Sequence, residues 1–293
     1  MDTHPLPLTT TMEDQIQNVI KSEKRRCSNC KGTGKAGQII DPIGRTIDLD
    51  CAECIPIIEE KIKLISCGIP ITFLEIDEVS NHLSKKDKKF VSILKDKIQE
   101  NPEKMRFISL SSDWKGVGKT GTIAYLVKFH LRELIKKNPR MESMPITWVN
   151  AGFLANKLYG ELKNNRSDEE KQKAKEFMDS VKMNHILVID GLGDHYIKPS
   201  GDGDEQWISS KFEEIFRYRS ESGLSIYCTS NYRLLAVDSE KPNKDITIHS
   251  KYGERFVGLW SMSDFIWYDW KTTEDIRRLE TTGDNELEEY RSN

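Results

Sequence analysis

The sequence predicts an α/β fold in which helices flank a parallel β-sheet, with a small separate region before this core. Short apolar runs of strand length alternate with longer amphipathic segments between residues 104 and 293. A glycine-containing loop joins the first of these runs, residues 107–110, to a helical segment. Two C-x-x-C cysteine pairs lie before the core. The alternation favours a parallel sheet, because each crossover between parallel strands needs a covering helix.

The individual elements follow from the same patterns. We expect strands at residues 107–110, 146–150, 186–190, 224–227 and 265–270, and an extended segment at 71–76. We expect helices at residues 12–26, 57–66, 83–99, 153–163, 207–219 and 249–259, and one more starting at Lys119. A charged stretch, residues 164–175, receives no element. The predicted domains are residues 1–66, residues 67–103 as a linker with a helix, and the core at 104–293.

Composition bounds the location and the classes of partner. The chain has 293 residues, 31% of them charged, with a net charge of −3, so any nucleic-acid site must be a local patch. No apolar run reaches the roughly 18 residues that a membrane span needs, and residues 1–15 lack the apolar core of a secretory signal. We therefore expect a cytoplasmic protein without a membrane partner.

The loop at residues 113–120 reads Asp-Trp-Lys-Gly-Val-Gly-Lys-Thr. It follows the phosphate-binding pattern G-x-x-x-x-G-K-[ST], between a strand and a helix, as that motif requires. Lys119 would reach the β- and γ-phosphates, and the Thr120 hydroxyl would bind Mg²⁺. Asp113 replaces the first glycine, so it needs a turn that glycine adopts more easily and places a carboxylate near phosphate. The candidate cofactor-binding residues here are Asp113, Trp114, Lys115, Gly116, Val117, Gly118, Lys119, Thr120 and Gly121.

Two later strands end in polar residues that suit the same site. The run at 186–190 ends in Asp190, which would hold the hydration shell of Mg²⁺ beside Thr120. The run at 224–227 leads to Asn231, which could orient water against the γ-phosphate. A polar residue after a strand is also common for turn reasons alone.

The cysteine pairs are Cys27 with Cys30 and, after twenty further residues, Cys51 with Cys54. Two such pairs predict a tetrahedral Cys₄ zinc site, and four thiolates leave no open position, so the zinc should be structural. The alternatives are two redox pairs or unligated thiols.

Together these residues resemble the DnaC/DnaI/IstB group of AAA+ ATPases, over about residues 67–279. That group comprises bacterial and phage replicative helicase loaders and their transposition relatives. The segment Gly-Ile-Pro at 68–70, the loop at 107–120 and the Leu-Gly pair at 192–193 are similar to its motifs. Two further segments are similar to motifs of that group: Arg219 followed by Thr-Ser-Asn at 229–231, and Gly-Glu-Arg at 253–255. Cysteines 27–54 resemble the zinc module of DnaI-type loaders.

The resemblance implies a function and further site residues. It implies ATP as the nucleotide, an arginine finger at Arg255 that acts across a self-oligomer at the ATP site, and a sensor arginine at Arg277 or Arg278. It also implies two partners, a hexameric DnaB-type replicative helicase contacted by the zinc module, and single-stranded DNA. For the DNA, the candidates are Lys157, Lys163 and Arg166, although a solvated helix face would look the same.

The sequence departs from the family at one position that bears on catalysis. A glutamate that polarises the attacking water usually follows the Mg²⁺ aspartate, and here that position is Gly191. Asp194 and Glu205 are the nearest other acids. We therefore expect slow hydrolysis, with an acid at position 191 raising turnover. The alternative functions are an IstB-like transposition ATPase, a nucleotide-binding scaffold with little hydrolysis, and a zinc-ribbon nucleic-acid binder with a decayed phosphate loop.

Overall fold

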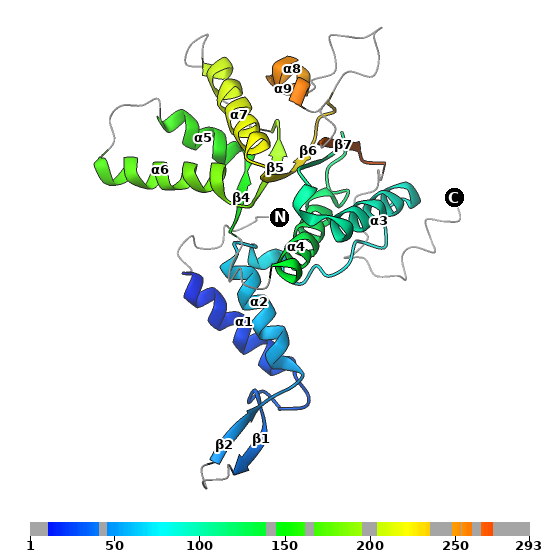
Figure 1. Cartoon of the computed structure of the whole chain (residues 1–293), viewed down its shortest axis with the longest axis vertical. Helices are drawn as coiled ribbons and strands as arrows, with labels where there is room; N and C mark the ends of the chain where they lie inside the picture. The colour runs from blue at the N-terminus through cyan, green and yellow to red at the C-terminus, as the bar shows by residue number, and fades with distance from the viewer. Residues whose placement is uncertain are drawn as a thin grey trace, which may run out of the picture. The chain divides into compact units, whose positions relative to one another are not determined.

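The computed structural model describes residues 11–40, 46–138, 145–161, 167–194, 204–234, 248–252, 254–259 and 265–271. The chain divides into two compact units, Met1–Glu75 and Ile76–Asn293, and Figure 1 labels their helices and strands. None of the helices in these described ranges is long and apolar enough to span a bilayer.

In its described residues, 11–40 and 46–75, the first unit contains two helices, a β-hairpin and a short 3₁₀ turn. These are α1 (Met12–Arg26), β1 (Lys35–Ile40), β2 (Thr46–Asp50), α2 (Cys54–Ser66) and η1 (Ile71–Phe73). The two helices pack against each other, with Val19, Ile58 and Leu64 buried. The hairpin was not predicted, and the prediction of an extended 71–76 was wrong. Pro70 is extended there, and the chain then turns immediately, with Phe73 N–H donating to the Pro70 carbonyl.

The second unit is built on a five-stranded sheet. Its helical elements are α3 (Lys85–Glu100), η2 (Pro102–Lys104), α4 (Lys119–Lys137), α5 (Ala151–Glu161), α6 (Asp168–Met183), α7 (Asp204–Glu221), α8 (Ile248–Tyr252) and α9 (Glu254–Leu259). Its strands are β3 (Phe107–Ser111), β4 (Ile146–Asn150), β5 (Ile186–Leu192), β6 (Ser225–Ser230) and β7 (Phe265–Asp269). They lie in the order β4-β5-β6-β3-β7, and all four neighbouring pairs are parallel.

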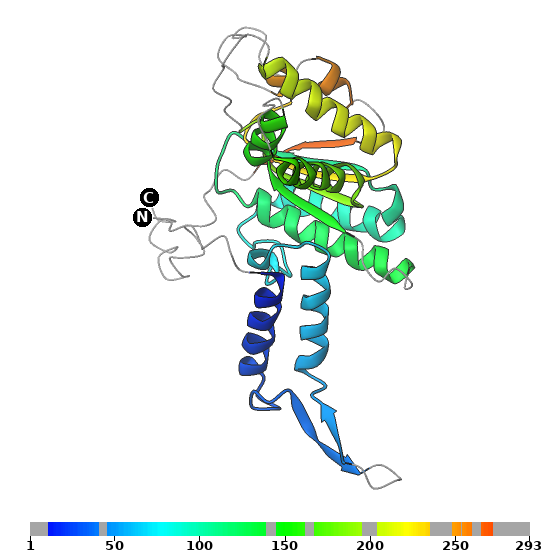
Figure 2. The same ribbon diagram turned by 90° about the vertical axis from the view of Figure 1, so that its left-hand side faces the viewer.

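Helices cover both faces of this sheet. Helix α4 packs on β3 and β6 with α3 behind it, while α5 and α7 pack on the opposite face together with α6 (Figure 2). Strands buried on both sides read as continuous apolar runs, which is why the sequence revealed them. The predicted fold class, a parallel sheet flanked by helices, is confirmed.

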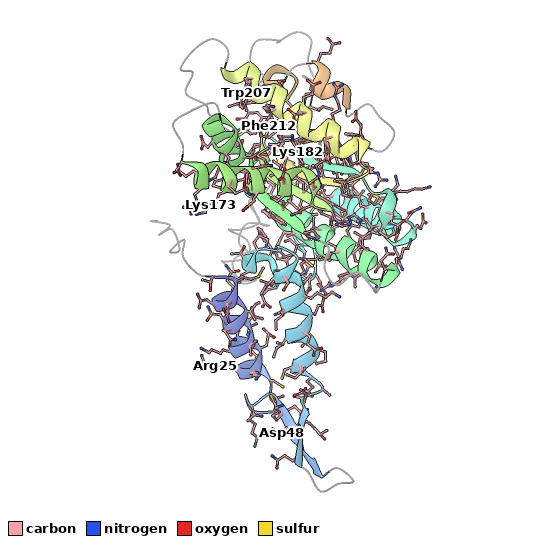
Figure 3. All side chains as sticks on the ribbon, turned by 60° about the vertical axis from the view of Figure 1, so that its left-hand side comes forward. Arg25, Asp48, Lys173, Lys182, Trp207 and Phe212 are labelled. Atoms are coloured by element: carbon pink, nitrogen blue, oxygen red, sulfur yellow. The ribbon has the colours of Figure 1, made fainter. Side chains whose placement is uncertain are left out.

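The face under α7 holds a large hydrophobic cluster of buried residues. Phe212 of α7 points into it and is fully buried, and Phe216 contacts Phe107 edge to face (Figure 3). Helix α6 is attached to α7 by an ion pair between Lys182 and Glu214 at 2.6 Å. Helix α6 begins within the charged stretch that received no element, residues 164–175, and continues eight residues beyond it. The sequence feature that could have predicted the start of this helix is the capping box formed by Ser167 and Glu170.

Arg219 is fully buried at the end of α7 and has a structural task. Its guanidinium donates to four carbonyl oxygens, those of Val181 (2.9 Å), Lys182 (3.1 Å), His185 (3.2 Å) and Ser225 (2.7 Å). These carbonyls belong to the end of α6 and the starts of β5 and β6. Arg219 therefore links the starts of β5 and β6, and the opposite ends of these strands carry the candidate site.

Candidate functional site

The phosphate loop connects the end of β3 to the start of α4. Gly116 (φ 77°) and Gly118 (φ 83°) adopt left-handed conformations, which other residues adopt at a cost. The indole N–H of Trp270, just after β7, donates to the Val117 carbonyl at 2.7 Å and so ties the loop to the end of β7. The loop thus has the shape that brings backbone N–H groups and the N-terminus of α4 toward one point.

Lys119, the first residue of α4, lies inside this loop with 7% of its surface exposed. Its ammonium donates to the carbonyls of Trp114 (2.7 Å) and Ser112 (3.4 Å). Burial lowers the pKa of Lys119 to about 8, although the nearby carboxylates of Asp194, Asp190 and Asp113 oppose that shift. A polyanion bound in the loop would stabilise the charged ammonium.

Thr120 and Asp190 meet as the sequence predicted. The Thr120 hydroxyl donates to the Asp190 carboxylate at 2.8 Å, so α4 and β5 are joined at the carboxyl edge of the sheet. Thr229 of β6 donates to the same carboxylate oxygen at 2.5 Å and accepts from the Gly191 N–H at 2.9 Å. A hydroxyl and a carboxylate at this separation form the donor set that Mg²⁺ prefers next to bound phosphates.

Asp113 does not have the geometry that we expected. Among the residues that the structure describes, Lys31 is the single non-glycine residue with a positive φ, so Asp113 needs no glycine-like backbone. Its carboxylate forms an ion pair with Arg233 at 2.9 Å. The negative charge at the first loop position is therefore offset by a guanidinium that lies two residues beyond Asn231 in the sequence.

Asn231 follows β6 and lies beside an acid. Its side-chain amide donates to the Asp194 carboxylate at 2.6 Å. Burial raises the pKa of Asp194, against the opposing effects of Asn231, Lys115 and Lys251. Asp194 is one of the two acids named above as nearest to Gly191, and the turn after β5 brings its carboxylate back to this edge of the sheet.

The remaining predicted residues are distributed differently. Trp114 and Lys115 are exposed on the loop, and Gly121 lies in the first turn of α4. Arg255 belongs to α9, but its side chain lies outside the described residues. Arg277, Arg278, Lys163 and Arg166 also lie outside the described residues. Lys157 is exposed on α5, with its ammonium 5.2 Å from the centre of the Phe153 ring.

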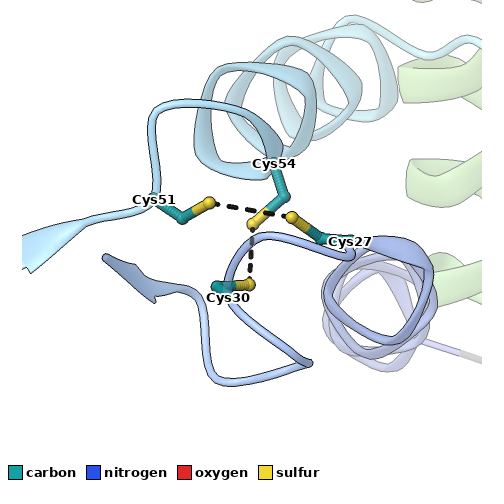
Figure 4. Close-up of side chains that lie close together, drawn as sticks. All are labelled: Cys27, Cys30, Cys51 and Cys54. Carbon is teal, nitrogen blue, oxygen red and sulfur yellow. Dashed lines mark hydrogen bonds between the residues drawn. The ribbon is translucent and has the colours of Figure 1, made fainter. Parts of the chain in front are cut away.

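The four paired cysteines form a cluster in the first unit. All four sulfur atoms lie within 4.8 Å of one another, with Cys27 to Cys51 at 3.7 Å and Cys30 to Cys54 at 3.6 Å (Figure 4). Tetrahedral zinc with Zn–S bonds of about 2.3 Å places sulfurs roughly 3.8 Å apart, so the donor set fits that ion. The Gly34 N–H donates to the Cys30 sulfur at 3.2 Å, which would favour its thiolate form.

Three residues of the nucleotide site were missed or left unassigned by sequence reasoning. Thr229 was noted only as part of a motif, Asp194 only as one of the acids nearest to Gly191, and Arg233 was not considered. Asp194 and Arg233 could have been suspected from their positions, just after β5 and β6 at the carboxyl edge of the sheet. Their partners could not, because Asp113 and Arg233 are far apart in sequence.

No protein-family model matches the chain, and no curated protein matches it. Among solved structures it is similar to the DnaC helicase loader, with 18% identity, coverage of 69% of this chain and 100% of that chain, and a TM-score of 0.47. It is similar to DnaI (20% identity, 71% and 93% coverage, TM-score 0.41). It is also similar to domain III of the Thermotoga maritima replication initiation protein DnaA (13% identity, 70% and 69% coverage, TM-score 0.45). At these identities the likeness concerns the fold.

Proposed function

We propose that this protein is an ATP-dependent loader of a hexameric replicative helicase, with a zinc module at its N-terminus and an AAA+ core. The observation that carries the nucleotide part is the 2.8 Å hydrogen bond between Thr120 and Asp190, beside the buried ammonium of Lys119. It joins the two motifs that a Mg²⁺–ATP site needs. The helicase part is supported by the sequence motifs, which resemble those of the DnaC/DnaI/IstB group.

The residues would divide the work as follows. The loop at 113–120 and Lys119 would hold the phosphates, and Thr120 and Asp190 would hold Mg²⁺, which neutralises phosphate charge when it is bound. Thr229 orients Asp190 through the 2.5 Å hydrogen bond. Arg255 of a neighbouring copy would reach the nucleotide across a self-oligomer, and Arg277 or Arg278 would sense it. Because phosphoryl transfer in such sites depends on positioning and charge, the same contacts can report nucleotide state.

The zinc module is the proposed contact to the helicase. Cys27, Cys30, Cys51 and Cys54 would hold one structural Zn²⁺ between the end of α1 and the start of α2. A closed Cys₄ site has no open position for chemistry, so its contribution would be the stability of a binding surface.

Single-stranded DNA is the second proposed partner. Phe153 of α5 is half exposed, and the exposed Lys157 lies over its ring. Exposed aromatic rings stack on bases, and nearby cations neutralise the phosphates of the strand. Lys163 and Arg166 follow in the same segment of sequence.

Nucleotide-dependent capture tests the proposal. The tagged full-length chain is mixed with the purified DnaB-type helicase of the same organism, with ATP, ADP or no nucleotide. We expect more helicase to be retained with ATP, and Lys119→Ala to abolish this difference. Lys136→Ala, which changes an exposed lysine at the far end of α4, is the matched control. Retention that is absent with every nucleotide would contradict the loader function, even if ATP binds.

A further inference from the structure

The turn that follows β5 places a carboxylate beside the candidate phosphate site. The Asp194 N–H donates to the Gly191 carbonyl at 2.9 Å, and Gly191 (φ 75°) and Gly193 (φ 91°) both adopt left-handed conformations. The chain therefore reverses within four residues, and the Asp194 side chain comes back to the end of β5.

The position of this carboxylate relative to Gly191 is the central observation. A Cβ atom built on Gly191 would lie 3.0 Å from Asp194 Oδ2 and 3.5 Å from Asp194 Cβ. The Asp194 side chain thus occupies the space into which any side chain of residue 191 would project. In ATPases of this type the acid next to the Mg²⁺ aspartate projects from that position.

One further contact and one electrostatic effect relate the carboxylate to the site. The Asn231 amide donates to Asp194 Oδ2 at 2.6 Å and so ties the turn after β5 to the end of β6. Among the carboxylates that raise the pKa of Lys119, Asp194 has the largest effect, ahead of Asp190. The charged groups around Asp194 are Lys115, Lys251 and Lys119, and the Tyr232 hydroxyl is also near.

We infer that Asp194 supplies the catalytic carboxylate that Gly191 lacks, and that it orients and deprotonates the water attacking the γ-phosphate. This inference rests on the proposed nucleotide site. As the water oxygen bonds to the γ-phosphorus, the bond from that phosphorus to the β,γ-bridging oxygen breaks and ADP leaves with the electron pair. The water proton passes to the Asp194 carboxylate and then to solvent. Asn231 positions Asp194 by holding Oδ2.

This geometry revises the expectation that an acid at position 191 raises turnover. Gly191 has a φ of 75°, which L residues rarely adopt, and Asp194 fills the adjacent space. Gly191→Glu should therefore leave turnover unchanged or lower it.

The test compares Asp194→Asn with Asp96→Asn, which removes an exposed carboxylate from α3. Asparagine at 194 keeps an oxygen that can accept from Asn231 but cannot take a proton. Single-turnover phosphate release and titration with ATP are measured with Mg²⁺. We expect Asp194→Asn to lower the hydrolysis rate by about 10²- to 10⁴-fold. Its ATP affinity should remain within a fewfold of wild type or become tighter, because one negative charge leaves the phosphate site.

The outcomes separate this inference from the proposed function. If the wild type binds no ATP, the proposed function fails. If it binds ATP and Asp194→Asn hydrolyses it at the wild-type rate, Asp194 is not the catalytic carboxylate. The same conclusion follows if Gly191→Glu alone raises the rate. Should Asp194→Asn fail to fold, Asn231→Ser carries the test: slower hydrolysis with retained ATP binding supports the inference, and an unchanged rate overturns it.

Discussion

The guanidinium of Arg233 forms an ion pair with the carboxylate of Asp113 at 2.9 Å, which links the end of β6 to the first position of the phosphate loop. An unpaired carboxylate at that position would repel the phosphates of a nucleotide. The pair explains how the loop tolerates an aspartate where a glycine is usual. It also gives Arg233 a role in nucleotide affinity without requiring it to touch the nucleotide.

Arg233→Ala should therefore weaken ATP binding. Both side chains are about half exposed, so solvent screens the pair and the loss should be roughly 0.5–1 kcal/mol, or about two- to fivefold in Kd. The double variant Asp113→Asn/Arg233→Ala should recover most of the affinity. Arg217→Ala, which removes a surface pair with Glu213 on α7, is the control. An Arg233→Ala protein that binds ATP as well as wild type would contradict this account of Asp113.

Zinc should be present at one ion per chain and should depend on the cysteine cluster. Cys51→Ser should lower zinc content to near zero, because three thiolates and a hydroxyl bind the ion much more weakly. Residues 11–66 should become sensitive to protease, while ATP binding persists, since the second unit has its own core. Metal analysis and limited proteolysis measure both effects.

Cys67→Ala is the matched control for zinc, because Cys67 is a buried thiol outside the cluster. Zinc content should be unchanged in that variant. Wild-type protein that contains no zinc, with all six cysteines reactive as free thiols, would exclude the metal site.

His130 should make the stability of the core fall in acid. Its Nε2 lies 2.8 Å from the Pro102 carbonyl, which can only accept, so Nε2 carries the proton and Nδ1 accepts from the Tyr227 hydroxyl at 2.8 Å. Burial lowers the pKa of His130 to about 4, with a smaller contribution from Arg106. The neutral ring is thus favoured in the folded state. The contribution of the neutral ring to the free energy of unfolding is fully present above pH 6.5 and is lost as the pH falls toward 4.

Between pH 6.5 and pH 4, the titration of His130 should lower the free energy of unfolding by roughly 3 kcal/mol, because each unit of pKa shift corresponds to about 1.36 kcal/mol. Denaturant unfolding at several pH values measures it. His130→Gln should reduce the pH dependence between 6.5 and 4 by up to one proton, whereas His82→Gln, which changes a histidine outside this network, should not. Equal slopes for wild type and His130→Gln would refute the assignment.

Single-stranded DNA binding should depend on the segment that follows β4. Reversing the charges of Lys157, Lys163 and Arg166 should lower affinity for an oligo-dT strand and flatten its salt dependence, because fewer phosphate counterions are released. Reversing three exposed lysines of α3, Lys86, Lys89 and Lys97, is the matched control. Fluorescence anisotropy at several salt concentrations provides the readout, and unchanged affinity and slope in the first variant would exclude this patch.

Much of the fold could be predicted because burial leaves a clear pattern in the sequence. The strand at Ile146–Asn150 matched its prediction at both ends, and β3, β5 and β7 differed by one or two residues at one end. Strand β6 begins one residue later and ends three residues later than predicted. The hairpin β1–β2 was not predicted, because its two strands are short and mix glycine and charged residues with a few apolar ones, of which Leu49 stays exposed. Helix α6 was not predicted because its many charged residues obscure the apolar face in the sequence.

The site was predictable in its local motifs and not in its long-range contacts. The loop at 113–120, Asp190 and the four cysteines follow from spacing alone. Asp194 reaches the site because of left-handed glycines at 191 and 193, a backbone property that the residue order suggests only weakly. Arg233 and Asp113 meet because parallel strands end at the same edge of the sheet. The sequence predicts that both residues lie near this edge, but it does not predict that their side chains pair.

Titration calorimetry with Mg²⁺–ATP tests the central claim, the nucleotide site formed by the phosphate loop, Thr120 and Asp190, most directly. Wild type should bind ATP, and Lys119→Ala should lose affinity on the order of 10- to 100-fold, because the phosphates lose their buried cation. Asp190→Asn should affect binding less than hydrolysis, and Lys136→Ala should match wild type. Wild-type protein without measurable ATP binding, or Lys119→Ala with wild-type affinity, would contradict the claim.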